Sequence, residues 1–165
     1  MKRIGCLIAA LSLLMTLSAC HTGGEAEPTL RIGVALYQQE DTFIETVTRE
    51  LQRVALEKEQ AQNCKINLYI TDGKESQTSQ NEQVDRFLER GYDVICVNIV
   101  DRTAAAVIID KAQAAGVPVI FFNREPLEED LRRWKHAYYV GLPGGDAGIL
   151  QGELVLDAWQ THSDA

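Results

Sequence analysis

Polar and aromatic side chains follow three apolar runs of this 165-residue chain, at the points where the runs end. They are Asp41 and Phe43 after the first run, Asn98 and Asp101 after the third, and Asn123, Arg124 and Glu125 after the fourth. Carboxylate and amide groups suit sugar hydroxyls, which donate and accept hydrogen bonds together. An aromatic ring packs on the apolar face of a pyranose. These residue types favour a carbohydrate site, although turn or helix-capping roles, and a core position for Phe43, also explain them one by one.

Five apolar runs alternate with segments of helical periodicity, and these elements must position the candidate residues. The runs are Leu30–Tyr37, Ile66–Thr71, Asp93–Val100, Val117–Asn123 and Ala137–Gly141, and a last helix is predicted over about Asp146 to Trp159. Near-continuous apolar strands predict burial on both faces, and therefore an α/β fold with a doubly wound parallel sheet flanked by helices. In such sheets ligands bind at the carboxyl ends of the strands, where the candidate side chains fall.

Motifs of the common enzyme classes are missing from the sequence. No GxGxxG follows the first predicted strand, and neither GxxxxGK[ST] nor GxSxG occurs. The glycine-rich segment Gly141–Gly148 opens a predicted helix, so it is either a phosphate cradle or a flexible strand-to-helix turn. The histidines His21, His136 and His162 lack metal-ligand spacing. The sequence therefore disfavours an enzyme.

Composition and charge narrow the class of protein further. The chain carries 24 acidic and 16 basic side chains, a formal net charge of −8, which argues against binding nucleic acid or a membrane surface through basic residues. Its length suits one α/β domain. Cys64 and Cys96 lack CxxC spacing, so they indicate neither a metal nor a redox site, and a disulfide between them stays open. Cys96 is predicted to be a small buried core residue.

The first 29 residues have the order of an export signal followed by a tether. Lys2 and Arg3 precede an uncharged apolar run that ends in "LSAC" at Cys20, which resembles the bacterial lipobox. Residues 1–19 are therefore predicted as a signal peptide, Cys20 as a lipidation site, and residues 20–29 as a lipid-attached tether. An ordinary signal peptide cut near Ala19 and an uncleaved anchor are the alternatives.

Several segments, taken in order, carry a family resemblance from Arg31 to Trp159. They are "RIGVALYQQEDTFIETV", "NIVD", "FFNREP" and "YYVG" followed by "GILQG". With these motifs the chain resembles the N-terminal lobe of periplasmic galactose/glucose (methyl-galactoside) binding proteins, which have the type I periplasmic-binding-protein fold. No DNA-binding headpiece precedes the first strand, unlike in the sugar-responsive repressors that share this fold.

The resemblance implies specific roles for three residues. Asp41 would accept hydrogen bonds from a hexose hydroxyl, Phe43 would stack on the sugar, and Asn98 would be a second hydroxyl partner. It further implies a non-enzymatic substrate-binding lipoprotein of an ABC transporter. That protein would be exported to the periplasm or the outer face of the cell membrane, with a permease and a chemoreceptor as partners.

The same resemblance implies that residues 30–165 form only an N-terminal sugar-binding lobe. The family's second lobe, which carries further sugar partners and a calcium loop, has no counterpart among the residues of this chain. The chain is thus predicted to be truncated, to need no cofactor of its own, and to bind hexose weakly or not at all. An interaction lipoprotein that docks on a membrane sensor without binding sugar remains the alternative.

Overall fold

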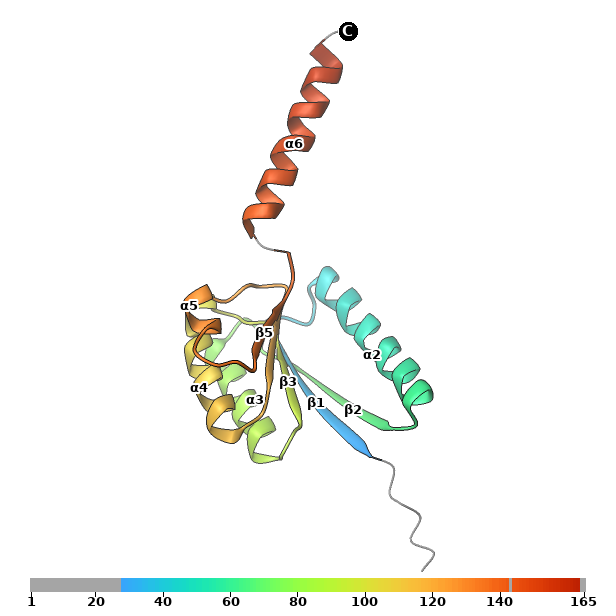
Figure 1. The fold of residues 1–165 in the computed structure, drawn as a ribbon, viewed down its shortest axis with the longest axis vertical. Helices are drawn as coiled ribbons and strands as arrows, with labels where there is room; N and C mark the ends of the chain where they lie inside the picture. The colour runs from blue at the N-terminus through green and yellow to red at the C-terminus, as the bar shows by residue number, and fades with distance from the viewer. Residues whose placement is uncertain (1–27, 143, 164–165) are drawn as a thin grey trace, which may run out of the picture.

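A five-stranded parallel sheet organises the part of the chain that the computed structural model describes, residues 28–142 and 144–163 (Figure 1). The strands are β1 (Thr29–Leu36), β2 (Lys65–Asp72), β3 (Val94–Val97), β4 (Val119–Phe122) and β5 (Ala137–Val140). They lie in the order β2-β1-β3-β4-β5, and every neighbouring pair is parallel. The predicted α/β fold with a doubly wound parallel sheet is confirmed.

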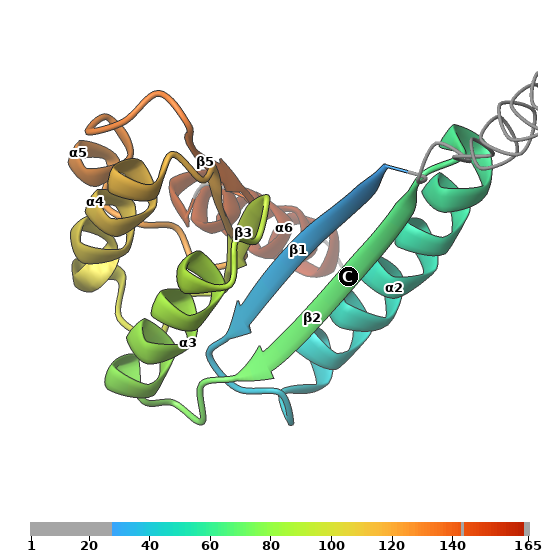
Figure 2. The same ribbon diagram turned by 90° about the horizontal axis from the view of Figure 1, so that it is seen from below.

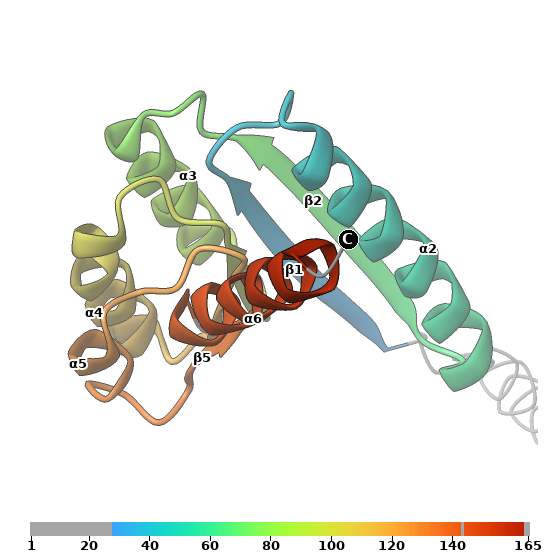
Figure 3. The same ribbon diagram turned by 90° about the horizontal axis from the view of Figure 1, so that it is seen from above.

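The helices divide unequally between the two faces of this sheet. They are α2 (Thr42–Gln62), α3 (Gln77–Glu89), the 3-10 turn η2 (Arg102–Ala104), α4 (Ala105–Ala115), α5 (Glu128–Leu131) and α6 (Gly144–Ser163). Helices α3, α4 and α5 cover one face, whereas α2 lies on the other (Figures 2 and 3). The prediction that all strands are buried on both faces is wrong for β5, because Tyr138 and Val140 are exposed on the α2 side.

The larger core fills the space between the sheet and helices α3 and α4. Its fully buried side chains include Ile108, Ile109 and Phe121. Gly33 of β1 lies directly under the ring of Phe87, since a Cβ there would fall 2.6 Å from ring carbons. Glycine at this position therefore allows α3 to approach the sheet closely.

Polar caps fix the points where the chain leaves the strands and enters the helices. The Asp41 carboxylate accepts a hydrogen bond from the backbone N–H of Ile44 at 3.0 Å and begins α2. Ser76 begins α3 in the same way, and Gly116 ends α4 with a left-handed backbone, φ 70°. Because only five residues separate Leu36 from the start of α2 at Thr42, the first turn of α2 lies close to the end of β1.

Helix α6 extends away from the sheet (Figure 1). It is longer than predicted and begins after a three-residue connection, 141–143, from β5. None of the described helices is long and apolar enough to cross a membrane. The predicted signal peptide, most of the tether and Cys20 lie outside the described residues.

Candidate carbohydrate site at the carboxyl ends of the strands

Asp41 is held by two hydrogen bonds at the carboxyl end of β1. The Tyr37 hydroxyl donates a short hydrogen bond to Oδ2, and the backbone N–H of Ile44 donates to Oδ1. The Tyr37 hydrogen bond, followed by the one from Ile44, lowers the pKa of the Asp41 carboxyl, while the pKa of Tyr37 is raised chiefly by the same contact. Asp41 is therefore an ionised acceptor, partly exposed to solvent.

Phe43 lies in the first turn of α2, two residues after Asp41, and its side chain is exposed to solvent. The residue is 59% exposed, so the alternative that it belongs to the core is wrong. It lines an open hollow of about 370 Å³ with Val47, Phe122, Asn123, Val140, Gly141 and Leu142. The hollow is mainly apolar and lies between the start of α2 and the ends of β4 and β5. An aromatic ring at its rim is available for stacking on an apolar face of a ligand.

Asn98 occupies the end of β3 and is fully buried. Its side-chain Nδ2 donates to the carbonyl of Phe122 at 3.2 Å, which links β3 to β4. Among the described buried side chains, its Oδ1 has no hydrogen-bond partner. A buried amide oxygen without a hydrogen-bond partner costs about 1–3 kcal/mol of folding free energy.

Arg124 contacts groups that follow β1 and β3. Its guanidinium carbon lies 4.6 Å from the centre of the Tyr37 ring, and its Nη1 donates to the carbonyls of Ile99 (3.2 Å) and Val100 (2.7 Å). Arg124 thus joins the ends of β1, β3 and β4. The preceding residue, Asn123, adopts a left-handed backbone, φ 63°, at the turn where the chain leaves β4.

Gln80 is a positioning residue that the sequence did not single out. It is fully buried under the carboxyl ends of β1 and β3. Its Nε2 donates to the carbonyls of Ala35 (3.3 Å) and Asn98 (2.9 Å), and its Oε1 accepts from the backbone N–H of Val100 (3.0 Å). Gln80 therefore fixes the backbone that carries Asn98.

Asp101, the other acidic candidate of this edge, is a capping residue. One of its carboxylate oxygens accepts from both the backbone N–H and the hydroxyl of Thr103, at 2.9 and 2.7 Å. Both hydrogen bonds lower the pKa of the Asp101 carboxyl, and the one from the Thr103 hydroxyl has the larger effect. The structure thus brings Tyr37, Asp41 and Arg124 together and leaves Asp101 occupied at the start of η2.

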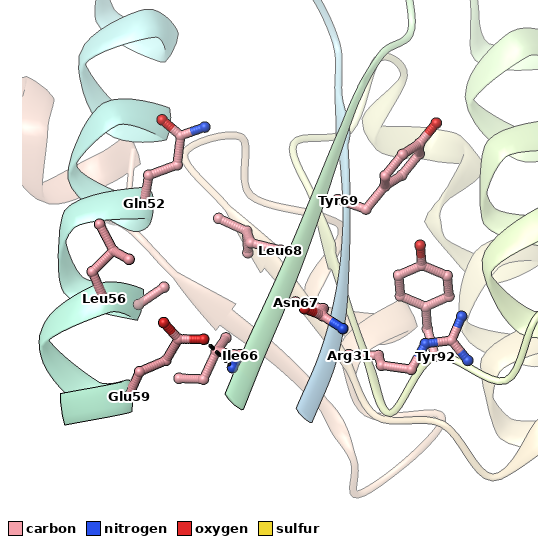
Figure 4. Close-up of a pocket in the computed structure, with 10 residues that line it drawn as sticks. Arg31, Gln52, Leu56, Glu59, Ile66, Asn67, Leu68, Tyr69 and Tyr92 are labelled. Carbon is pink, nitrogen blue, oxygen red and sulfur yellow. Dashed lines mark hydrogen bonds between the residues drawn. The ribbon is translucent and has the colours of Figure 1, made fainter. Parts of the chain in front are cut away.

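A larger hollow, of about 600 Å³, lies far from these residues at the amino-terminal half of β2 (Figure 4). Leu68 lines it on the α2 side of the strand and Tyr69 on the opposite side, so it wraps around the exposed edge of β2 instead of forming an enclosed pocket. Glu59 already accepts from the backbone N–H of Ile66 there, at 2.6 Å. None of the predicted sugar contacts lies in it.

Metal and thiol chemistry gain no support from the described residues. Within them no group of three or more His, Cys, Asp or Glu side chains is arranged to hold a metal ion. Cys64 and Cys96 are both free thiols, and burial raises the pKa of Cys96 to about 11. Cys96 was predicted to be a buried core residue; it is partly buried and packs against the smaller core cluster of Val34, Leu36 and Ile44.

Comparison with known proteins decides the family. A family model for the periplasmic binding protein domain matches residues 32–164. The chain belongs to this family. It is also 35% identical over 132 residues to the D-galactose/methyl-galactoside binding periplasmic protein MglB of Haemophilus influenzae, covering 80% of this chain and 38% of that protein.

Solved structures of family members share the same fold. The arabinose-binding component of an ABC transporter from Shewanella sp. ANA-3 superposes with a TM-score of 0.67 at 19% identity, over 79% of this chain and 40% of that one. A carbohydrate-transporter binding protein from Chloroflexus aurantiacus, solved with D-glucose, gives 0.60 at 25% identity, over 78% and 35%. The chain spans about two fifths of the length of these family members.

Proposed function

We propose that residues 30–165 are the N-terminal sugar-binding lobe of a substrate-binding lipoprotein that serves an ABC transporter, with a galactose- or glucose-type hexose as ligand. The observation that carries the proposal is the pairing, at the start of α2, of the ionised Asp41 carboxylate with the exposed Phe43 ring. The carboxylate would accept from hydroxyls while the ring covers the apolar face of the sugar. The matches to sugar-binding proteins support this ligand class.

The described residues supply one side of such a site. Phe43 and the hollow beside it are open to solvent, and nothing in the described chain lies opposite them. An open surface leaves water free to compete for every sugar hydroxyl, so a second wall is needed for tight binding. We therefore propose that a second lobe completes the site. The protein would capture the sugar and deliver it to a membrane permease, without making or breaking a covalent bond.

Calorimetry on two proteins tests this function. The 165-residue chain alone should show no micromolar binding of galactose or glucose; micromolar affinity of a monomer would contradict the half-site. A chimaeric protein that joins this lobe, through α6, to the second lobe of the Haemophilus relative should bind one of these hexoses. In that protein Asp41→Ala and Asn98→Ala should each weaken binding at least about 100-fold, because each leaves sugar hydroxyls without a charged or buried partner.

A matched control separates a lost contact from a damaged lobe. Thr42→Ala alters an exposed neighbour of Asp41 and should leave the affinity unchanged. Unchanged affinity in the Asp41 variant would contradict the proposal that this lobe binds sugar. It would favour the alternative, an interaction lipoprotein that docks on a membrane sensor.

A further inference from the structure

The side chain of Arg124 reaches across the carboxyl edge of the sheet, from the end of β4 to the end of β1. These two strands are not neighbours, because β3 lies between them. On the way, Nη1 of Arg124 donates to the carbonyls of Ile99 and Val100, which follow β3, at 3.2 and 2.7 Å. The guanidinium carbon lies 4.6 Å from the centre of the Tyr37 ring, just after β1. The two carbonyls thus hold the guanidinium against the ring.

A strained turn directs Arg124 back over the sheet. The N–H of Arg124 donates to the carbonyl of Phe122 at 2.7 Å, which closes a three-residue turn. Asn123, in the middle of this turn, has a left-handed backbone with φ 63°, which costs free energy in a residue other than glycine. The N–H of Asn123 donates to the carbonyl of Val140 at 3.1 Å, so β5 supports the turn. A costly backbone conformation that a neighbouring strand holds in place indicates that the direction of Arg124 matters.

A cation on the face of a phenol ring changes the strength of its hydroxyl as a donor. The negative face of the ring attracts the guanidinium, which in turn draws electron density from the ring. A phenol that has lost electron density donates a stronger hydrogen bond. The hydroxyl of Tyr37 donates to the carboxylate of Asp41. The guanidinium of Arg124 therefore favours this hydrogen bond, and with it the charged form of the acceptor.

We propose that Arg124 is a positioning residue for the candidate carbohydrate site, and that it acts through Tyr37 by strengthening the hydrogen bond that holds the Asp41 carboxylate. This inference rests on the proposed function and deepens it, because Asp41 is the acceptor proposed for the sugar hydroxyls. Arginine suits the role, since its planar group donates hydrogen bonds while its face lies on a ring. The ammonium group of lysine is a point charge without such a face.

The charges around Tyr37 agree with this role. The pKa of Tyr37 is raised chiefly by its hydrogen bond to Asp41, then by burial, and further by the negative charges of Asp41 and Glu75, whereas the charge of Arg124 opposes the rise. Glu75 lies in the connection from β2 to α3. The pKa of Asp41 is lowered chiefly by the Tyr37 hydrogen bond, and the charge of Arg124 lowers it further. The cation thus acts on the carboxylate both directly and through the phenol.

A double-mutant cycle on the titration of Asp41 separates these two routes. Carboxyl ¹³C NMR follows Asp41 in the parent chain, in Arg124→Gln, in Tyr37→Phe and in the double variant. We expect Arg124→Gln to raise the pKa of Asp41 in the parent, and to raise it clearly less when Tyr37→Phe is present. Equal rises in both backgrounds would overturn the proposal, because Arg124 would then act by its charge alone. An unchanged pKa in Arg124→Gln would overturn it too.

Two further variants sharpen the titration. Arg102→Gln is the matched control, because Arg102 also donates to a backbone carbonyl at this edge, that of Glu125, and it should leave the pKa of Asp41 unchanged. Arg124→Lys keeps a positive charge and tests the proposal even if Arg124→Gln folds poorly. It lacks the flat face that lies on Tyr37, so the pKa of Asp41 should rise in this variant as well. A titration identical to that of the parent chain would contradict the role of the stacked guanidinium.

Hexose binding by the two-lobe chimaera gives a second readout. Arg124→Gln should weaken binding by about tenfold, which is the scale of a lost cation–π contact, and it should weaken binding less when Tyr37→Phe is present. Arg102→Gln should leave the affinity unchanged. Unchanged affinity in Arg124→Gln would refute the positioning role. A chimaera that binds no hexose would contradict the proposed function, whereas the titrations, which contain no sugar, would still decide how Arg124 acts on Asp41.

Discussion

The Tyr37 hydroxyl donates a hydrogen bond to the carboxylate of Asp41, four residues further along the chain. That carboxylate also begins helix α2 through the N–H of Ile44. One side chain thus joins the end of β1 to the start of α2 and is kept ionised by both contacts. The same two hydrogen bonds therefore lower the pKa of Asp41 and connect the end of β1 to the start of α2.

Tyr37→Phe should raise the pKa of Asp41 toward its ordinary value, because the hydroxyl is the largest cause of its depression. A depressed carboxyl pKa contributes stability that is full above the unfolded-state value and is lost as pH falls through the folded-state value. The variant should therefore lose this contribution at a higher pH than the parent. Carboxyl ¹³C NMR titration of Asp41 measures the shift. Tyr69→Phe is the control, and an identical Asp41 titration in the Tyr37 variant would contradict the expectation.

Asp41→Ala should lower the urea midpoint of unfolding more than Asp41→Asn does. Alanine removes the cap of α2, whereas the asparagine side chain retains an oxygen for the N–H of Ile44 and loses only the charge. Urea unfolding followed by circular dichroism gives the order of stability. Equal midpoints for the two variants would show that the capping bond contributes nothing.

Gln80→Leu should destabilise the fold by about 3 kcal/mol, because it leaves the buried N–H of Val100 and the carbonyl of Asn98 without this partner. The change should also weaken hexose binding by the two-lobe chimaera, since the backbone at Asn98 loses its support. Gln113→Leu, on an exposed part of α4, is the control. A loss below about 0.5 kcal/mol, the ordinary range for surface changes, would contradict the positioning role.

Cys20→Ser should abolish incorporation of labelled fatty acid into the exported chain. Only a cysteine at the end of the lipobox-like segment supplies the thiol for lipid attachment. Metabolic labelling in a bacterial host, with Cys64→Ser as control, distinguishes the lipoprotein from an ordinary exported protein. Label retained in the Cys20 variant would refute this anchor.

Local sequence was sufficient to locate the strands and much of the site. The apolar runs predicted all five strands. The segments β3, β4 and β5 are uninterrupted apolar runs, whereas Arg31 interrupts β1 and Asn67 interrupts β2. The strand-end rule selected a wider set of residues, from which the family resemblance singled out Asp41, Phe43 and Asn98. The structure places all three at the same edge of the sheet. Helix α5 was not predicted, since its four residues are too few for a periodic pattern.

Local sequence patterns could not predict the burial of residues whose neighbours in the fold are distant in the sequence. Gln80 lies in the polar stretch "QTSQNEQ", where nothing distinguishes a buried glutamine from an exposed one. The exposed face of β5 was missed for the opposite reason. "AYYV" is as apolar as a strand covered on both faces, and whether a helix covers it depends on chain far from it in sequence.

Gly33 links the packing of α3 to the backbone at the candidate site. A Cβ at this position would fall 2.6 Å from ring carbons of Phe87, so a larger residue would push α3 away from β1. The same helix carries Gln80, whose side chain donates a hydrogen bond to the carbonyl of Asn98. A methyl group added in the middle of β1 would therefore displace the backbone at the end of β3.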